Sequence, residues 1–125
     1  MPDDRLELRI ELDPGADADA EERDDAARAL RRDLLDLDID AVERPAEPAP
    51  PGTRAGDAVT LATLIVTMGP TALAAVGGIV QGWMARRGDR RVTLELEGDR
   101  IELSGASDAD QRRLVDAFVA RHERR

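Results

Sequence analysis

The sequence predicts an α+β fold in which a four-stranded sheet is covered by helices. Three observations carry this prediction: a β-α-β pattern over residues 1–44, a β-β-α pattern over residues 90–122, and an uncharged helical segment between them. Strands and helices that each bury one apolar face form stable layers when they pack on each other. With 125 residues, of which 42% are apolar, the chain is expected to form a single domain around one modest core.

The first unit opens with the alternation typical of a half-buried strand. In "RLELRIELD", aliphatic residues face one side and charged residues face the other. A "PG" pair then turns the chain into a segment rich in Ala, Glu and Arg, from about residue 17 to 37. Because Ala27, Leu30 and Leu34 fall on one stripe of this segment, we expect an amphipathic helix.

A second strand is predicted where alternation returns, in "LDLDIDAVER". Three aspartates, Asp36, Asp38 and Asp40, would share the strand face opposite to the aliphatic residues. Several carboxylates on one face could bind a hard cation, which prefers oxygen ligands. No glycine-bearing calcium loop follows them, so we favour a solvated strand face and predict no metal site.

A proline-rich connector, residues 45–56, follows the first unit and holds four of the seven prolines of the chain. Proline favours an extended, polyproline-like backbone, so we expect a linker here. The stretch lacks the flanking basic and apolar residues that an SH3 ligand would need.

The closing unit begins with a predicted hairpin, "RRVTLELEGDRIELSG", that turns at Gly98 and Asp99. A final helix would start at a capping-box-like pair, Ser107 and Asp110. The apolar face of this helix is expected to carry Leu114, Val115, Phe118 and Val119.

The segment between the two units, residues 57–85, contains no charge after Asp57, which makes it long enough for a transmembrane helix. Trp83 and the two arginines after Ala85 also resemble an interfacial belt with a positive flank. A single crossing would, however, place the two units on opposite sides of a bilayer, where neither piece is large enough to fold alone. We therefore expect no membrane span, and we expect a helix broken at Gly69-Pro70.

The second part of this segment has one bulky face and one face of small residues. At 100° per residue, Ala74, Gly78 and Gly82 fall opposite the large aliphatic residues. Small residues at every fourth position let another backbone approach closely. One copy of the fold can shelter only one face, so another copy, a partner or lipid is expected to cover the other, unless a loop of the same chain does. The candidate interaction residues are Ala74, Gly78, Gly82 and Trp83, with Leu61, Leu64, Ile65 and Met68 of the preceding part.

The sequence offers few groups for catalysis. It contains two serines, one histidine and no cysteine or lysine, whereas nucleophilic catalysis needs an activated Ser, Cys or Lys beside a base. Ser104 and Ser107 are expected at turn and cap positions, and His122 is expected to be exposed near the end of the last helix. Gly77 and Gly78 lack the glycine spacing and the lysine of a phosphate loop. We therefore expect neither enzymatic activity nor a cofactor.

The charge of the chain excludes further classes. A net charge of −9 disfavours nucleic acid as a partner, because nucleic-acid binding needs a basic surface. The acidic excess lies in residues 1–57, which carry a net charge of −10, whereas residues 86–125 carry +1. The N-terminal residues lack the pattern of a signal peptide and the chain has no cysteine, so we expect a cytoplasmic protein.

Three stretches carry a family resemblance: "LLDLDIDAVE", "PPGTRAGDAVTLATLIV" and "GGIVQGWMARRGDRRVTLELEGDRIELSGASDADQRRLVDAF". In their order, and over nearly the whole chain, they resemble the effector-associated constant component family of bacterial conflict systems. The resemblance implies a small companion protein without an active site. It also implies partners: effector-associated adaptor domains, caspase-like or trypsin-like peptidases, and signalling ATPases. It transfers no functional residue to a position of this chain.

Two functions are open at this point. The first is a non-enzymatic accessory or adaptor component of a conflict or immune-like signalling system, which forms a homo-oligomer through the apolar helical segment. The second is a membrane-directed effector whose apolar segment inserts into lipid or lies on it.

Overall fold

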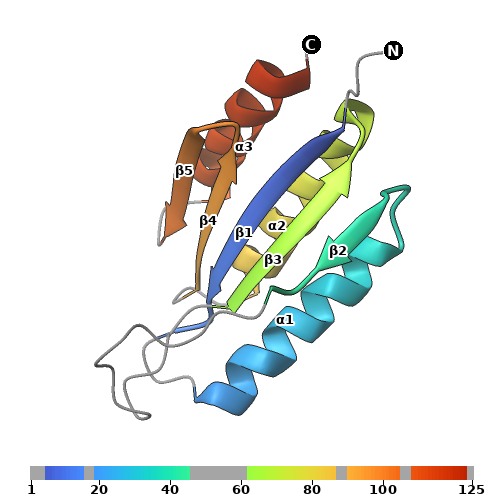
Figure 1. Cartoon of the computed structure of the whole chain (residues 1–125). Helices are drawn as coiled ribbons and strands as arrows, with labels where there is room; N and C mark the ends of the chain where they lie inside the picture. The colour runs from blue at the N-terminus through green and yellow to red at the C-terminus, as the bar shows by residue number, and fades with distance from the viewer. Residues whose placement is uncertain (1–4, 16–18, 46–61, 87–89, 105–107, 124–125) are drawn as a thin grey trace.

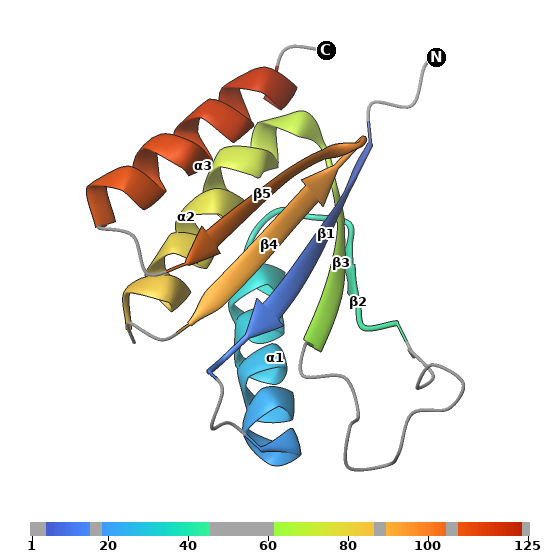
Figure 2. The same ribbon diagram turned by 90° about the vertical axis from the view of Figure 1, so that its left-hand side faces the viewer.

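The chain forms an antiparallel sheet of five strands, one strand more than predicted. The computed structural model describes residues 5–15, 19–45, 62–86, 90–104 and 108–123. Three helices cover one face of the sheet, and no described helix lies on the other face (Figures 1 and 2). The α+β class is therefore confirmed, whereas the predicted strand number is wrong.

The first strand and the first helix form where the sequence predicts them. Strand β1 (Leu6–Asp13) buries its four aliphatic side chains against the helices and turns its charged residues to the open face. Helix α1 (Ala20–Leu35) buries the predicted stripe of Ala27, Leu30 and Leu34. The periodicities of two and 3.6 residues thus identify the buried side of each element.

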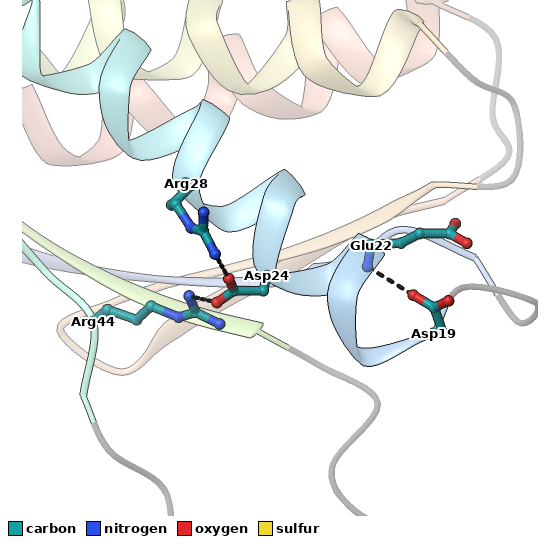
Figure 3. Close-up of polar contacts among 5 residues, drawn as sticks. All are labelled: Asp19, Glu22, Asp24, Arg28 and Arg44. Atoms are coloured by element: carbon teal, nitrogen blue, oxygen red, sulfur yellow. Dashed lines mark hydrogen bonds and ion pairs between the residues drawn. The ribbon is translucent and has the colours of Figure 1, made fainter.

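The start of α1 is fixed by polar contacts. The carboxylate of Asp19 accepts a hydrogen bond from the backbone N–H of Glu22 at 2.8 Å and caps the helix (Figure 3). Further along, Asp24 accepts hydrogen bonds from both Arg28 and Arg44, and the bond from Arg44 contributes most to lowering the pKa of Asp24. Because Arg44 directly follows β2 (Ala41–Glu43), this contact fastens α1 to that strand.

Strand β2 is much shorter than predicted. Residues 36–40 form the turn that follows α1, and pairing begins only where Asp40 N–H donates to Thr67 O at 2.9 Å. Leu37 and Ile39 are half-buried against the core in this turn. Residues that point alternately to the core and to water produce the same pattern in a turn as in a strand, which explains the error.

The larger correction concerns the first part of the uncharged segment. Residues Ala62–Met68 form strand β3, not a helix. This strand lies between β2 and β1 and pairs with both, with Leu8 opposite Val66. The open face of this strand carries Thr63, Ile65 and Thr67 where β1 carries charged residues, so the strand lacks the marked alternation of β1. The predicted connector, apart from Pro45, and residues 57–61 lie outside the described residues.

The predicted break at Gly69-Pro70 is the junction between this strand and a helix. Pro70 begins the short 3₁₀ turn η2 (Pro70–Ala72), which leads into helix α2 (Leu73–Ala85). Proline suits the first turn of a helix because its missing N–H has no partner there in any case. A helix of 13 residues spans about 20 Å, which matches the length of a strand.

Strands β4 (Arg91–Leu96) and β5 (Asp99–Ser104) form the predicted hairpin, but the turn is Glu97-Gly98, one residue earlier than predicted. Glu97 and Gly98 have φ values of 53° and 86°. Two successive positive φ values define the type I′ turn, whose twist matches that of the strands on either side.

Helix α3 (Asp108–Glu123) closes the described fold. Val115 and Phe118 are buried as predicted, whereas Leu114 is 43% exposed and Gln111 takes a buried position instead. Ser107, the predicted cap of this helix, lies outside the described residues.

The strand order is β2-β3-β1-β4-β5. Because β3 lies between β1 and β2, and β1 lies between β3 and β4, the first four strands with α1 and α2 form two split β-α-β units. Strand β5 and helix α3 extend this arrangement at one edge (Figure 1). In the helix layer, α2 packs against both α1 and α3 and is the central helix.

Candidate functional site

Helix α2 separates bulky residues from small ones. Leu73, Val76, Val80 and Trp83 are buried toward the sheet. On the opposite side small residues are exposed, and three of them follow one another at intervals of four positions. These three define what is here called the α2 small face (Ala74, Gly78 and Gly82). The central helix therefore presents an uncharged face outward from the helix layer.

Two adjacent glycines of α2 have different surroundings. A Cβ atom at Gly77 would lie 2.8 Å from Cγ1 of Val115 and 3.5 Å from Cγ2 of Val119, so α3 approaches the backbone of α2 closely at this point. A Cβ atom at Gly78 or Gly82 would meet no described atom within 4 Å. Gly77 thus serves packing within the chain, and the other two glycines leave open space.

The α2 small face borders a hollow between α2 and α3. The hollow has a volume of about 270 Å³, and its lining residues are Gly78, Gln81, Gly82, Ala85, Gln111 and Arg112. The Nε2 atom of Gln81 is buried and has no hydrogen-bond partner among the described residues. A group that enters the hollow could supply an acceptor to this atom.

Sequence reasoning missed the polar residues of the hollow. Gln81 could have been found, because it lies next to Gly82 and three residues after Gly78 on the same helix. Gln111 and Arg112 carry no such signal, since only the packing of α3 against α2 brings them there.

Trp83 belongs to the core and not to the α2 small face. The guanidinium of Arg90 lies 4.3 Å from the centroid of the buried indole ring, and Nη1 of Arg90 donates to the carbonyl oxygen of Trp83 at 2.8 Å. The backbone N–H of Arg86 donates to the same carbonyl oxygen at 3.4 Å, so Arg90 adds a second and shorter hydrogen bond at the end of the helix. The contact fixes the C-terminal end of α2.

The other candidates from the uncharged segment do not join the α2 small face. Leu64 and Met68 are buried in β3, and Ile65 is half-buried on the open face of the sheet. Leu61 lies outside the described residues. Within the described part of the chain, we find no helix with both the length and the apolar character that a bilayer crossing requires.

Of the residues considered for catalysis, His122 takes part in contacts between elements, and Ser104 lies far from it in the sheet. His122 was expected to be exposed, but its side chain is only 12% exposed and its Nε2 lies 2.8 Å from Oδ2 of Asp99. Nε of Arg121 donates to the same oxygen at 2.8 Å. The hydrogen bond from Arg121, followed by that from His122, lowers the pKa of Asp99 below its usual value. These contacts fasten the end of α3 to the start of β5, while Ser104 is exposed at the other end of that strand.

The aspartates considered for a metal ion do not converge. They lie in the turn after α1, where Oδ2 of Asp40 is 3.1 Å from Nη1 of Arg5. Among the residues that the structure describes, no group of three or more potential metal ligands is assembled.

Comparison with protein-family profiles matches residues 14–120 to the profile described as Effector Associated Constant Component 1. A search of curated proteins and a search of solved structures each found no match. The matched residues include α1, α2 and all but the last residues of α3. They also include strands β2 to β5, whereas β1 lies wholly outside the match. The match therefore takes in both α2 and the helix that packs on Gly77. The chain belongs to the Effector Associated Constant Component 1 family, an effector-associated component of conflict systems.

Proposed function

We propose that the chain is a non-enzymatic adaptor of its conflict system and that its copies join through the α2 small face. The observation that supports this most is the exposure of Ala74, Gly78 and Gly82 on a helix without a charged residue. A surface helix normally turns charged and polar side chains to water. Gln81 is the one polar side chain of α2, so its outer face resembles an interface more than a solvated surface.

The geometry of this face suits a second helix. Nothing described lies within 4 Å of a Cβ at Gly78 or Gly82, so another backbone can approach α2 closely at these positions. Helices α1 and α3 lie on either side of α2, so α2 would be at the centre of a contact between two helix layers. The α2 helix of another copy, with its own small face turned inward, fits this place.

The proposal that the adaptor is not an enzyme is supported by its chemistry. The chain has no cysteine and no lysine, and its histidine is engaged with Asp99. Effector proteins of the same system, of the peptidase or ATPase kind that the resemblance implies, would supply the activity. Assembly of the adaptor would bring several effectors together and raise their local concentration.

The proposal can be tested by measuring the mass of the assembly in solution for two matched variants. Gly78→Leu fills the open space on the α2 small face with a large side chain, and Ala117→Leu adds the same side chain to an exposed position of α3. Light scattering after gel filtration gives the mass, and circular dichroism gives the helix content. We expect Gly78→Leu to lower the mass of the assembly, Ala117→Leu to leave it unchanged, and both variants to keep the native spectrum.

Two outcomes would argue against the proposal. One is an assembly whose mass does not respond to Gly78→Leu. The other is an unmodified chain that is recovered as a single copy and floats with liposomes, which would favour the membrane-directed alternative.

A further inference from the structure

Strand β5 is an edge of the sheet. Its one neighbour in the strand order is β4, and no described element covers its outer side (Figure 2). The strand has six residues, whereas the opposite edge strand β2 has three. An exposed edge of this length presents backbone N–H and C=O groups that can pair with another strand.

The turn of the hairpin determines which backbone groups point outward. The turn Leu96-Glu97-Gly98-Asp99 joins residues 96 and 99 as a hydrogen-bonded pair, and hydrogen-bonded and non-hydrogen-bonded pairs then alternate along the hairpin. Ile101 and Leu103 therefore bond to β4, and Arg100, Glu102 and Ser104 direct their backbone groups away from the sheet.

The side chains of the edge are self-complementary. Arg100 and Glu102 are both exposed and carry opposite charges on either side of Ile101. In an antiparallel pair of β5 strands related by a two-fold axis at Ile101, Arg100 of each copy lies opposite Glu102 of the other. Glu102 has no ion-pair partner among the described residues, whereas Arg100 contacts Glu95 at 3.5 Å and Glu11 at 3.8 Å. The register would therefore supply the missing partner of Glu102 twice, once in each copy.

Apolar surface beside the edge supports the same occupant. Ile101 is half-buried, and two copies of it would meet at the axis. Leu114 is 43% exposed, and at 100° per residue it lies 100–140° around α3 from Val115 and Val119, the residues that face α2. It therefore points away from α2, on an exposed side of the helix that also contacts β5.

The distribution of charge also permits two copies to meet here. The chain as a whole carries −9, but residues 86–125, which contain β4, β5 and α3, carry +1. The acidic residues of α1 lie beside β2 and β3, toward the other edge of the sheet. Repulsion between two acidic chains is thus smallest at the β5 edge.

We infer that β5 pairs with β5 of a second copy, antiparallel and about a two-fold axis at Ile101, to form a continuous ten-stranded sheet. This surface is separate from the α2 small face, so it goes beyond the proposed function and does not depend on it. If both surfaces act, the chain has two self-complementary interfaces and can form assemblies larger than a dimer.

Cysteine cross-linking tests the register, because the chain has no cysteine of its own. In the proposed pair the two Ile101 residues face each other as a non-hydrogen-bonded pair with a Cα separation of about 4.5 Å, within the range of a disulfide. The two Ser104 residues would lie about 20 Å apart. Under mild oxidation, Ile101→Cys is expected to give a disulfide-linked dimer and Ser104→Cys to give none. Equal cross-linking of both variants, or no cross-linking of a folded Ile101→Cys variant, would overturn the inference.

Charge reversal tests the same pair in solution, in the Gly78→Leu background where the α2 small face is blocked. Arg100→Glu and Glu102→Arg alone each set like charges opposite one another and should weaken dimerisation roughly tenfold. The double reversal restores both opposite-charge pairs and should restore the dimer. Failure of the double variant to recover would contradict the inference. Because the cross-link at residue 101 does not involve α2, it remains informative even if the α2 small face proves inactive.

Discussion

Gly77 of α2 lies against Val115 of α3 so closely that a Cβ atom at residue 77 would approach Cγ1 of Val115 at 2.8 Å. The branched side chain of Val115 is itself buried, so it has little room to move away. The missing side chain at residue 77 therefore sets the distance between the central and the last helix.

This contact predicts opposite effects for two neighbouring substitutions. Gly77→Ala introduces an overlap with Val115 and is expected to lower the free energy of unfolding by about 1–3 kcal/mol. Gly78→Ala meets no described atom within 4 Å and should raise it by up to about 1 kcal/mol, because alanine favours the helix over glycine. Urea unfolding at low protein concentration measures both. Equal effects of the two substitutions would show that α3 does not approach α2 at residue 77 as described.

The cap of α1 predicts a loss of stability that a conservative variant avoids. Asp19→Ala removes the oxygen that accepts the N–H of Glu22 and should cost about 1 kcal/mol. Asp19→Ser keeps an acceptor at this position and should retain most of the stability. The midpoint of urea unfolding compares the two, and an equally large loss in both variants would contradict the capping role.

Asp99 predicts a stability difference that depends on pH. Its pKa in the folded chain is lowered by Arg121 and then by His122, below the ordinary value of 3.8. A lowered folded-state pKa stabilises the fold above the unfolded-state pKa, and this contribution is lost as the pH falls through the folded-state value.

Asp99→Asn should therefore lower the free energy of unfolding by about 1 kcal/mol at neutral pH, and the difference from the unmodified chain should shrink in acid. Asp116→Asn, at an exposed position of α3, is the matched control and should show no such difference. Urea unfolding over a pH series measures the difference in free energy of unfolding between each variant and the unmodified chain. A difference that stays constant down to acid pH would mean that the carboxylate does not act through its charge.

The elements with marked periodicity could be predicted from the sequence, and β3 could not. In β1 and α1 one side meets water, so charged residues mark it. Strand β3 carries no charged residue on its open face, so its apolar run looked continuous with α2. The available signal was composition: Thr63, Ile65, Val66 and Thr67 are β-branched and favour a strand, whereas the residues after Pro70 are mostly Ala, Gly and unbranched.

Only the part of the candidate site that depends on residue spacing within α2 could be predicted from the sequence. The spacing of Ala74, Gly78 and Gly82 placed them on one face, and this face is exposed in the structure. The sequence could not show that Gly77, and not Gly78, receives the neighbouring helix, because that depends on where α3 packs. For the same reason it could not reveal the contact between His122 and Asp99, which joins residues from two elements.

Sedimentation of the unmodified chain over a wide range of protein concentrations tests self-association most directly. If the α2 small face joins copies, the mass should exceed that of one chain and rise with concentration. A chain that sediments as a single copy at every concentration, with Gly78 and Gly82 left exposed, would contradict self-association through the α2 small face.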